Sequence, residues 1–493
     1  MDRRIRLLAL AFVACFGVLF LQLNNLQVRE AKRLQHNPNE PSTAVSQWLL
    51  PRGDIIDASG QVLAYSTKYE RGPGYVRHYP FGPLFADVTG AYDWTLQSNL
   101  YGIESEYNGY LVQHESTAHT LSGLLTQTEG TDSVEVTVSA RLQEIAKEAL
   151  APYNRGAVVA IDPTTGAILV MYSKPSYNPN RLASANPGAV RRYYASLDPS
   201  SGSSPLVNGA TDILAAPGST FKMVTTSAIF DHDPAIATET VPVLTALPLP
   251  QSNLLLHNYA GEACGGSLAE NLAVSCDTAF GHYGLQLGGE NLAEEAHAFG
   301  FDRPVPIDLP SGEVAVSNFP AGSSFAANQP GLAYSAIGQE NVSETALQDA
   351  LVLSAIADGG TIMTPHLMAH VFDEQGRVVA TYRPHAWLHA TSAATADQVR
   401  QLMIGVAEHG TAAGLFPPGL TVAAKTGTAE VGNNNCSTDW LVATAPAGAG
   451  QVPRVAVAAM VPYQPGLPCD GTGAEIAGPV VAKVLDAALG YGS

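Results

Sequence analysis

Residues 156–173 read GAVVAIDPTTGAILVMYS, two apolar runs that flank the segment DPTTG. The apolar runs are typical of strands, and a connection with Asp, Pro and Gly favours a tight turn, so this stretch predicts a β-hairpin. Strand-like runs follow one another near the C-terminus, at 420–431, 439–446 and 454–462. From the end of the hairpin to about residue 370 the sequence pattern is mainly helical. The pattern of residues 474–489 predicts a helix at the end of the domain. Strands on both sides of a helical middle predict an α+β fold, one sheet flanked by helices.

The chain ahead of this hairpin has a different character. The stretch PRGDIIDASGQVLAYS at 51–66 predicts a strand, a turn at Ser59-Gly60 and a second strand. Residues 71–132 are rich in Gly, Tyr and Pro, and 134–153 predict a strand followed by an amphipathic helix. We therefore expect a smaller N-terminal domain over residues 35–150 and a larger domain over 151–490.

The N-terminus carries the pattern of a membrane anchor. Three arginines lie within the first six residues, and the almost wholly apolar run 7–23 follows, with no charge until Arg29. This predicts a transmembrane helix over 7–27 with residues 1–6 in the cytoplasm, since positive charge favours the cytoplasmic side. A cleaved signal peptide is the alternative, although QLNNLQV after the run offers no small-residue cleavage site. The rest of the chain is then expected outside the cell membrane.

Charge and cysteine content narrow the class of protein further. The net charge is −19, and the sequence has no basic stripe that could neutralise the phosphates of a nucleic acid. This argues against nucleic-acid binding. Besides Cys15 there are four cysteines, and export would permit disulfides. Chain order suggests Cys264–Cys276 and Cys436–Cys469, one of three possible pairings. Free thiols and a zinc site are the alternatives, and the spacings fit no usual zinc pattern.

One of only seven lysines lies in the stretch AAPGSTFKMV, residues 215–224. Pro217 and Gly218 break the chain, so Ser219 stands where a helix begins, and Lys222 shares its face. A serine hydroxyl is a poor nucleophile unless a base takes its proton, and burial or a second cation would free the lysine amine for this task. The helix N-terminus also directs N–H groups at the same place, which suits an oxyanion.

Two further segments support a catalytic role for Ser219 and Lys222. Ser275-Cys276-Asp277 follows in the chain, and Lys425-Thr426-Gly427-Thr428 lies in a predicted strand. Ser-x-x-Lys, Ser-x-Asn/Asp and Lys-Thr-Gly in this order resemble the signature of penicillin-recognising serine acyltransferases. The stretches at 51–64, 156–180 and 336–367 are similar to class B penicillin-binding proteins of the actinobacterial type. No candidate glycosyltransferase domain precedes them, unlike in the bifunctional class A proteins.

The resemblance implies a role for each matched residue. Ser219 attacks the penultimate D-alanine carbonyl of a peptidoglycan stem ending in D-Ala-D-Ala, with Lys222 as general base and Ser275 as proton relay. Lys425 depresses the pKa of Lys222 and, with the hydroxyls of its motif, holds the substrate carboxylate, while Gly427 lets the strand backbone approach. The residues that bind substrate are expected to be Asp277, Thr426, Gly427 and Thr428. The N–H groups of Ser219 and Thr428 would form the oxyanion hole.

The same resemblance implies the partners and the architecture. An amine of a neighbouring stem takes the acyl group and forms the cross-link, β-lactams acylate Ser219, and no metal or cofactor is needed. The fold is a transpeptidase domain on a smaller N-terminal pedestal with one transmembrane helix. Partners would be a membrane-bound glycosyltransferase or proteins of division or elongation. A D,D-carboxypeptidase, a β-lactamase, a β-lactam sensor or a non-catalytic scaffold are the alternatives.

One residue departs from the family pattern. Asp277 stands where asparagine is usual, and an ionised Asp only accepts hydrogen bonds. It can pair with Lys222 and keep the amine charged, be protonated, or accept from a substrate amide. Outside the motifs, Arg52, Asp54 and Asp57 are expected to form buried ion pairs. Glu104 is expected to serve packing, with a partner surface as the alternative, and Trp440 to lie in the core, with a substrate-facing wall as the alternative.

Overall fold

The structure is a computed structural model that describes residues 12, 15–17, 22, 47–96, 101–112, 114–115, 129–431 and 436–490. The expected cytoplasmic stub at 1–6, and most of the expected anchor at 7–27, lie outside these residues. Within the described part of the chain, no helix has the length and apolar character needed to cross a bilayer.

Over the described ranges, the larger domain is built on a five-stranded antiparallel sheet in the order β17-β18-β19-β7-β8. The predicted hairpin lies at one side of this sheet. Its turn forms because Asp162 Oδ1 accepts from the N–H of Thr164 at 2.9 Å and Gly166 adopts a φ of +79°. The strands are β7 (Gly156–Ile161), β8 (Ile168–Lys174), β17 (Ala423–Val431), β18 (Cys436–Ala445) and β19 (Val455–Val461).

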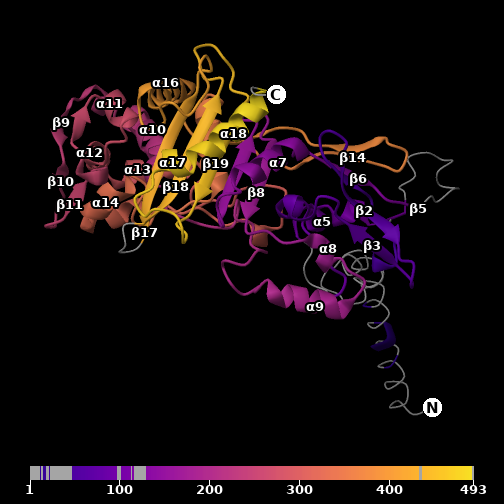
Figure 1. Ribbon diagram of the computed structural model, residues 1–493. Coiled ribbons are helices and arrows are strands. Elements are labelled where there is room, and N and C mark those ends of the chain that lie inside the picture. Colours follow the sequence, from indigo (N-terminus) through magenta and orange to yellow (C-terminus); the bar gives the residue numbers. More distant parts are fainter. Residues whose placement is uncertain are drawn as a thin grey trace.

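Helices cover both faces of this sheet (Figure 1). α7 (Ala140–Ala149) and α18 (Gly478–Leu489) pack against each other, with α18 on β18 and β19. On the other face α15 (Ala346–Ala357) packs on β19 and β7 and contacts α10 (Lys222–His232) and α16 (Ala393–His409). α15 is buried along its whole length because it lies between the sheet and these helices. The layers confirm the predicted α+β arrangement of an antiparallel sheet flanked by helices.

The helical middle also contains short strands that the sequence pattern did not predict. β9 (Val241–Leu244) pairs with β12 (Cys264–Gly266), β10 (Ala246–Pro248) with β11 (Leu255–His257), and β13 (Thr361–Met363) with β16 (Ala386–His389). Strands of three or four residues are too short to show an alternating pattern. The other helices here are α8 (Pro179–Leu182), α9 (Pro187–Ser196), α11 (Leu268–Ala273), α12 (Asp277–Leu287), α13 (Gly289–Ala298), α14 (Gln329–Ser335) and α17 (Gly473–Ile476), with 3-10 turns η3 (Gly218–Phe221), η4 (Ile236–Thr238), η5 (Tyr259–Gly261), η6 (Ser311–Glu313) and η7 (Gly322–Ala327).

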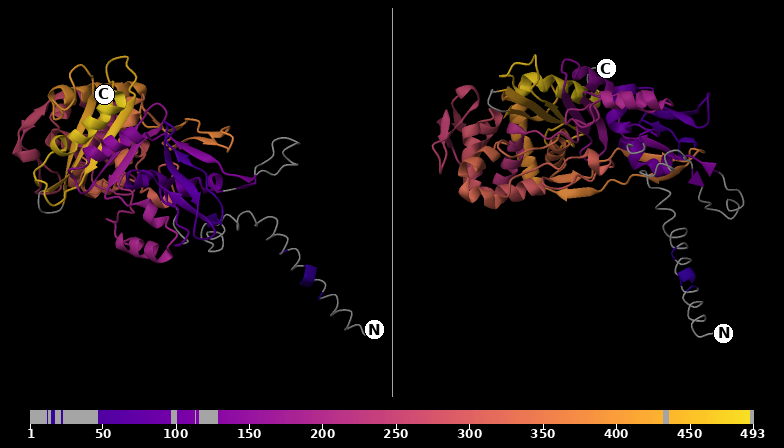
Figure 2. Two further views of the ribbon diagram at one scale, coloured as in Figure 1. Left: turned by 45° about the vertical axis from the view of Figure 1, so that its right-hand side comes forward. Right: turned by 90° about the horizontal axis from the view of Figure 1, so that it is seen from below.

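The N-terminal domain is a second sheet, six-stranded over the described residues, in the order β15-β14-β6-β1-β2-β3. Two of its strands come from far along the chain: β14 pairs with β6 antiparallel, Val371 opposite Val134. In Figure 1 this orange hairpin lies beside the violet N-terminal strands, and Figure 2 shows the same arrangement from two other directions. The strands are β1 (Ile55–Ile56), β2 (Val62–Lys68), β3 (Tyr75–His78), β6 (Ser133–Val136), β14 (Met368–Phe372) and β15 (Val378–Thr381).

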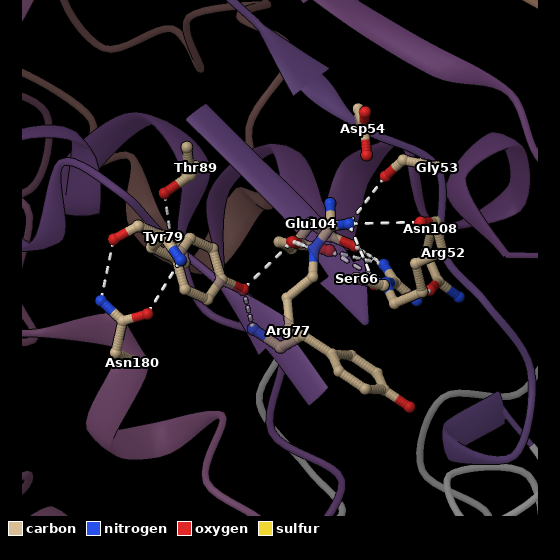
Figure 3. A network of polar contacts seen from close by, with 12 residues as sticks. Arg52, Gly53, Asp54, Ser66, Arg77, Tyr79, Thr89, Glu104, Asn108 and Asn180 are labelled. Carbon is tan, nitrogen blue, oxygen red and sulfur yellow. Dashed lines mark hydrogen bonds and ion pairs between the residues drawn. The ribbon is translucent and has the colours of Figure 1, made fainter. Parts of the chain in front are cut away.

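Short elements complete this domain around a buried ion network (Figure 3). Glu104 is fully buried, and its carboxylate accepts from Arg52 Nη2 at 2.7 Å, from Arg77 Nε at 2.6 Å and from Tyr79 Oη at 3.0 Å. The ion pair expected for Arg52 is therefore confirmed, whereas Asp57 accepts from backbone N–H groups instead of a cation. The short elements are η2 (Gly82–Phe85), α4 (Ala86–Thr89), α5 (Gly102–Glu106), α6 (Asn108–Leu111), β4 (His114–Glu115) and β5 (Glu129–Gly130).

Candidate active site

The turn η3 places Ser219 directly against strand β17. Gly218 precedes it with a φ of +57°, and the N–H of Gly218 donates to the carbonyl of Gly338 at 2.9 Å. A Cβ on Gly218 would lie 2.8 Å from the carbonyl oxygen of Thr428, so this close approach requires glycine. Ser219 is partly exposed, and α10 continues from the turn with Lys222 as its first residue.

Lys222 turns its amine toward the second motif. Its Nζ donates to the Ser275 carbonyl at 2.7 Å and to Asp277 Oδ1 at 2.7 Å, and lies 3.3 Å from Ser275 Oγ. The Lys222 side chain is fully buried, whereas that of Asp277 is 18% exposed. The sequence left three roles open for Asp277, and in the structure it forms the ion pair with Lys222.

Lys425 reaches the same serine from the opposite side. Its Nζ donates to Ser275 Oγ at 2.9 Å and to the Thr426 carbonyl at 2.9 Å, and it too is fully buried. Ser275 Oγ therefore lies between two amines. Lys222 and Lys425, which lie 53 and 150 residues from Ser275 in the chain, meet at this one hydroxyl.

A disulfide holds Ser275 in this place. Cys264 of β12 is bonded to Cys276, and the two Cα atoms are 5.8 Å apart. Ser275 has a φ of +60°, a region that non-glycine residues rarely adopt, so its neighbours must fix it. The N–H of Cys276 also donates to the Asn271 carbonyl at 2.8 Å. Both predicted disulfides are confirmed, since Cys436 is bonded to Cys469.

The β17 motif packs closely under the nucleophile turn. A Cβ on Gly427 would lie 2.6 Å from the Pro217 carbonyl oxygen, which explains why this position is glycine. Thr426 Oγ1 lies 2.7 Å from Thr411 Oγ1, and Thr428 Oγ1 accepts from the N–H of Gly473 at 3.1 Å. Sequence reasoning missed Thr411 and Gly473, which belong to no motif.

Trp440 has a structural role next to the site. It is fully buried on β18, opposite Gly427, and its indole N–H donates to the Ala216 carbonyl at 2.9 Å. The expectation that it packs in the core is confirmed, and it also fixes the chain that leads into the nucleophile turn.

Comparison with known proteins assigns this geometry to a family. The chain matches the family described as "Penicillin binding protein transpeptidase domain" over residues 156–486, and "Penicillin binding protein A dimerisation domain" over residues 52–136. The chain belongs to the class B penicillin-binding proteins. The resemblance drawn from the three motifs is thereby confirmed.

Two relatives from actinobacteria match this class B penicillin-binding protein over almost its whole length. It is 33% identical over 510 residues to peptidoglycan D,D-transpeptidase PbpA of Mycobacterium tuberculosis, with 99% of each chain covered. The protein of the same name from Mycolicibacterium smegmatis is also 33% identical, with 100% of each covered. The penicillin G acyl-enzyme complex of M. tuberculosis penicillin-binding protein A superposes with a TM-score of 0.79 at 33% identity, covering 89% of this chain and 100% of that one.

Burial and charge set the protonation of the two amines. Burial lowers the pKa of Lys222, and the Asp277 carboxylate acts in the opposite direction. Burial and the neighbouring Lys222 hold the pKa of Lys425 well below its ordinary range. Since two ammonium groups beside one hydroxyl repel each other, this class B penicillin-binding protein favours one neutral amine in its active site.

Proposed function

We propose that the chain is a peptidoglycan D,D-transpeptidase that cross-links stem peptides through an acyl-enzyme on Ser219 and is acylated there by β-lactams. The observation that carries this proposal is the meeting of Lys222, Ser275 and Lys425 beside the Ser219 turn. The M. tuberculosis relative forms acyl-enzyme complexes with penicillin G and imipenem, which supports the β-lactam part.

In the first half-reaction, Ser219 Oγ attacks the penultimate D-alanine carbonyl of the donor stem. The bound donor carboxylate favours the ammonium form of Lys425, which leaves Lys222 as the neutral amine that takes the hydroxyl proton, and the N–H groups of Ser219 and Thr428 stabilise the oxyanion. Ser275, within reach of both amines, passes the proton to the amine of the departing D-alanine as the C–N bond breaks. The product is an ester on Ser219.

In the second half-reaction, an amine of a neighbouring stem attacks this ester and restores the serine hydroxyl. Before acylation, Lys425, Thr426 and Thr428 hold the terminal carboxylate of the donor stem, because a cation and hydroxyl donors suit it, and this carboxylate leaves with the departing D-alanine. Thr428 is well placed for this, since its oxygen accepts from Gly473 N–H and its own proton stays available to the ligand.

We further propose that residues 7–27 anchor the chain in the cell membrane, with residues 1–6 in the cytoplasm and the catalytic domain outside. The apolar run after three arginines supports this topology. Partners would then be membrane-bound, a glycosyltransferase or proteins of the division or elongation machinery. Alkaline extraction of membranes tests the anchor: a chain released without detergent would contradict it.

Mass spectrometry after incubation with penicillin G tests the acyl-enzyme. We expect one stable adduct on Ser219 and none in Ser219→Ala. The transfer step is tested by supplying a D-Ala-D-Ala donor with an amine acceptor and measuring the cross-linked product against free acid. Rapid loss of the penicillin adduct, or acid as the sole product, would indicate a hydrolase, and absence of any adduct would indicate a scaffold.

A further inference from the structure

Two carboxylic acids lie in the core directly behind the nucleophile turn. Glu344 and Asp349 are each 1% exposed, Asp349 on α15 and Glu344 just before it. Their carboxyl groups interact with each other and with the side chain of Thr220, the residue after Ser219. None of the motifs contains these two acids, and the proposed mechanism gives them no role.

The backbone also joins this segment to the turn. Ala215 and Glu344 exchange two hydrogen bonds, N–H to carbonyl at 3.0 and 2.9 Å. Gly338, a few residues earlier in the same segment, accepts from the N–H of Gly218. The chain that carries Ser219 is therefore held from behind by the segment that carries Glu344.

The hydrogen-bond donors around the two acids are too few for two carboxylates. Thr220 has a single hydroxyl proton, and its Oγ1 already lies 3.2 Å from the Pro217 carbonyl as a donor. Glu344 Oε1 and Asp349 Oδ2 have no hydrogen-bond partner among the described residues. A buried carboxylate needs a cation or several donors, so the pair must supply protons of its own.

The charged groups on the surrounding elements are engaged elsewhere. Lys222 of α10 and Lys425 of β17 donate to the Ser275–Asp277 segment. Arg400 of α16 pairs with Asp397, and Asp231, near the far end of α10, accepts from Thr391 and Thr395. Within the described residues, neither acid of the pair forms an ion pair with a cation.

We propose that Glu344 and Asp349 form a protonated carboxyl pair that positions the Ser219 turn, and that loss of a proton from this pair slows acylation. The proposal rests on the acyl-enzyme function assigned to Ser219. While protonated, the pair leaves the Thr220 hydroxyl free to donate to Pro217. Once ionised, it competes for that hydroxyl and places a negative charge behind the amide groups where the oxyanion must form.

The titration range of the pair supports a test at alkaline pH. Burial raises the pKa of Asp349 to about 8, and burial together with Asp349 raises that of Glu344 well above its ordinary value. The protonated fraction of a group with such a pKa falls about tenfold between pH 7 and pH 9. The rate of acylation should fall with this protonated fraction, even though the neutral form of the lysine base becomes more populated as the pH rises.

The experiment measures the second-order rate of acylation by a fluorescent penicillin from pH 6 to 9.5, using the full chain in detergent. The double variant Glu344→Gln with Asp349→Asn keeps the shape of the pair and cannot ionise. We expect the ratio of its rate to the wild-type rate to rise about tenfold between pH 7 and pH 9. Taking a ratio cancels the titration of the lysines, which both proteins share.

A matched control is Glu295→Gln, because burial raises the pKa of Glu295 to about 9 at a site where it bonds to His232. The ratio of the Glu295→Gln rate to the wild-type rate should not change between pH 7 and pH 9. If the double variant unfolds, Asp349→Asn alone should still give a rise, since it removes one of the two ionising groups and burial still raises the pKa of the remaining Glu344. A ratio that stays flat in a folded variant overturns the proposal. Absence of acylation at every pH would instead overturn the assigned function, so the two failures are distinguishable.

Discussion

Replacing Asp277 by asparagine tests how the active site controls its base. The Asp277 carboxylate lies 2.7 Å from Lys222 Nζ, and both Lys222 and Lys425 are fully buried beside it. A negative charge at this distance favours the ammonium form of Lys222, which cannot accept the proton of Ser219. The variant Asp277→Asn keeps the size of the side chain and removes the charge. The pKa of Lys222 should then fall.

The size of the effect follows from the geometry. At 2.7 Å and an effective dielectric constant of about 20, the gross attraction is about 6 kcal/mol. Asp277 remains 18% exposed, so solvent screens part of this, and a close opposite charge typically changes a pKa by about 1–3. We expect the acid limb of the acylation rate to move to lower pH by that amount, equivalent to about 1.4–4 kcal/mol. The sign is fixed: removing an anion always lowers the pKa of an amine.

Stopped-flow acylation by a fluorescent penicillin from pH 5 to 9 measures this limb. Well below the wild-type midpoint, the variant should react about tenfold faster for each pH unit by which the midpoint falls. Asp397→Asn, which loses an ion pair with Arg400 on α16, serves as control and should leave the limb unchanged. A limb that stays in place, or moves to higher pH, would refute the assignment of Lys222 as the base governed by Asp277.

Two further predictions concern stability. Replacing Cys264 and Cys276 by alanine opens a loop with a sequence separation of 12, which should lower the free energy of unfolding by about 2–3 kcal/mol in urea titrations. It should also slow acylation because Ser275 loses its tether, and an unchanged rate would show that backbone hydrogen bonds suffice. Glu104→Gln leaves two buried guanidinium groups without a counter-charge and should cost about 3–5 kcal/mol, whereas Glu144→Gln, in an exposed pair with Lys147, should cost less than about 0.5 kcal/mol. Burial alone would raise the pKa of Glu104, but Arg77 and Arg52 lower it, so its contribution is present above its unfolded pKa and lost as pH falls through the folded value. Wild type should therefore lose more stability than Glu104→Gln on acidification below about pH 4.5, and equal losses would contradict the network's role.

Much of the site could be predicted from the sequence because its parts are local. Ser219 and Lys222 lie on one turn, each of the three motifs is a short segment that can be recognised by itself, and Cys264 and Cys276 are close in the chain. Thr411 and Gly473, which hold the hydroxyls of the β17 motif, could not be found this way. They lie 15 and 45 residues from their partners in the chain and carry no pattern of their own.

The sequence by itself determined the hairpin of β7 and β8 and the closing strands, because turn chemistry and side-chain periodicity are properties of adjacent residues. Its three motifs also indicated which side chains to propose as the reacting groups. Only the tertiary structure decided that Asp277 pairs with Lys222 instead of facing a substrate. It also decided that the β14–β15 hairpin completes the N-terminal sheet and that Glu344 and Asp349 meet behind Ser219. These outcomes depend on how long connections bring distant segments together, and burial then fixes which charges and protons the meeting groups can keep.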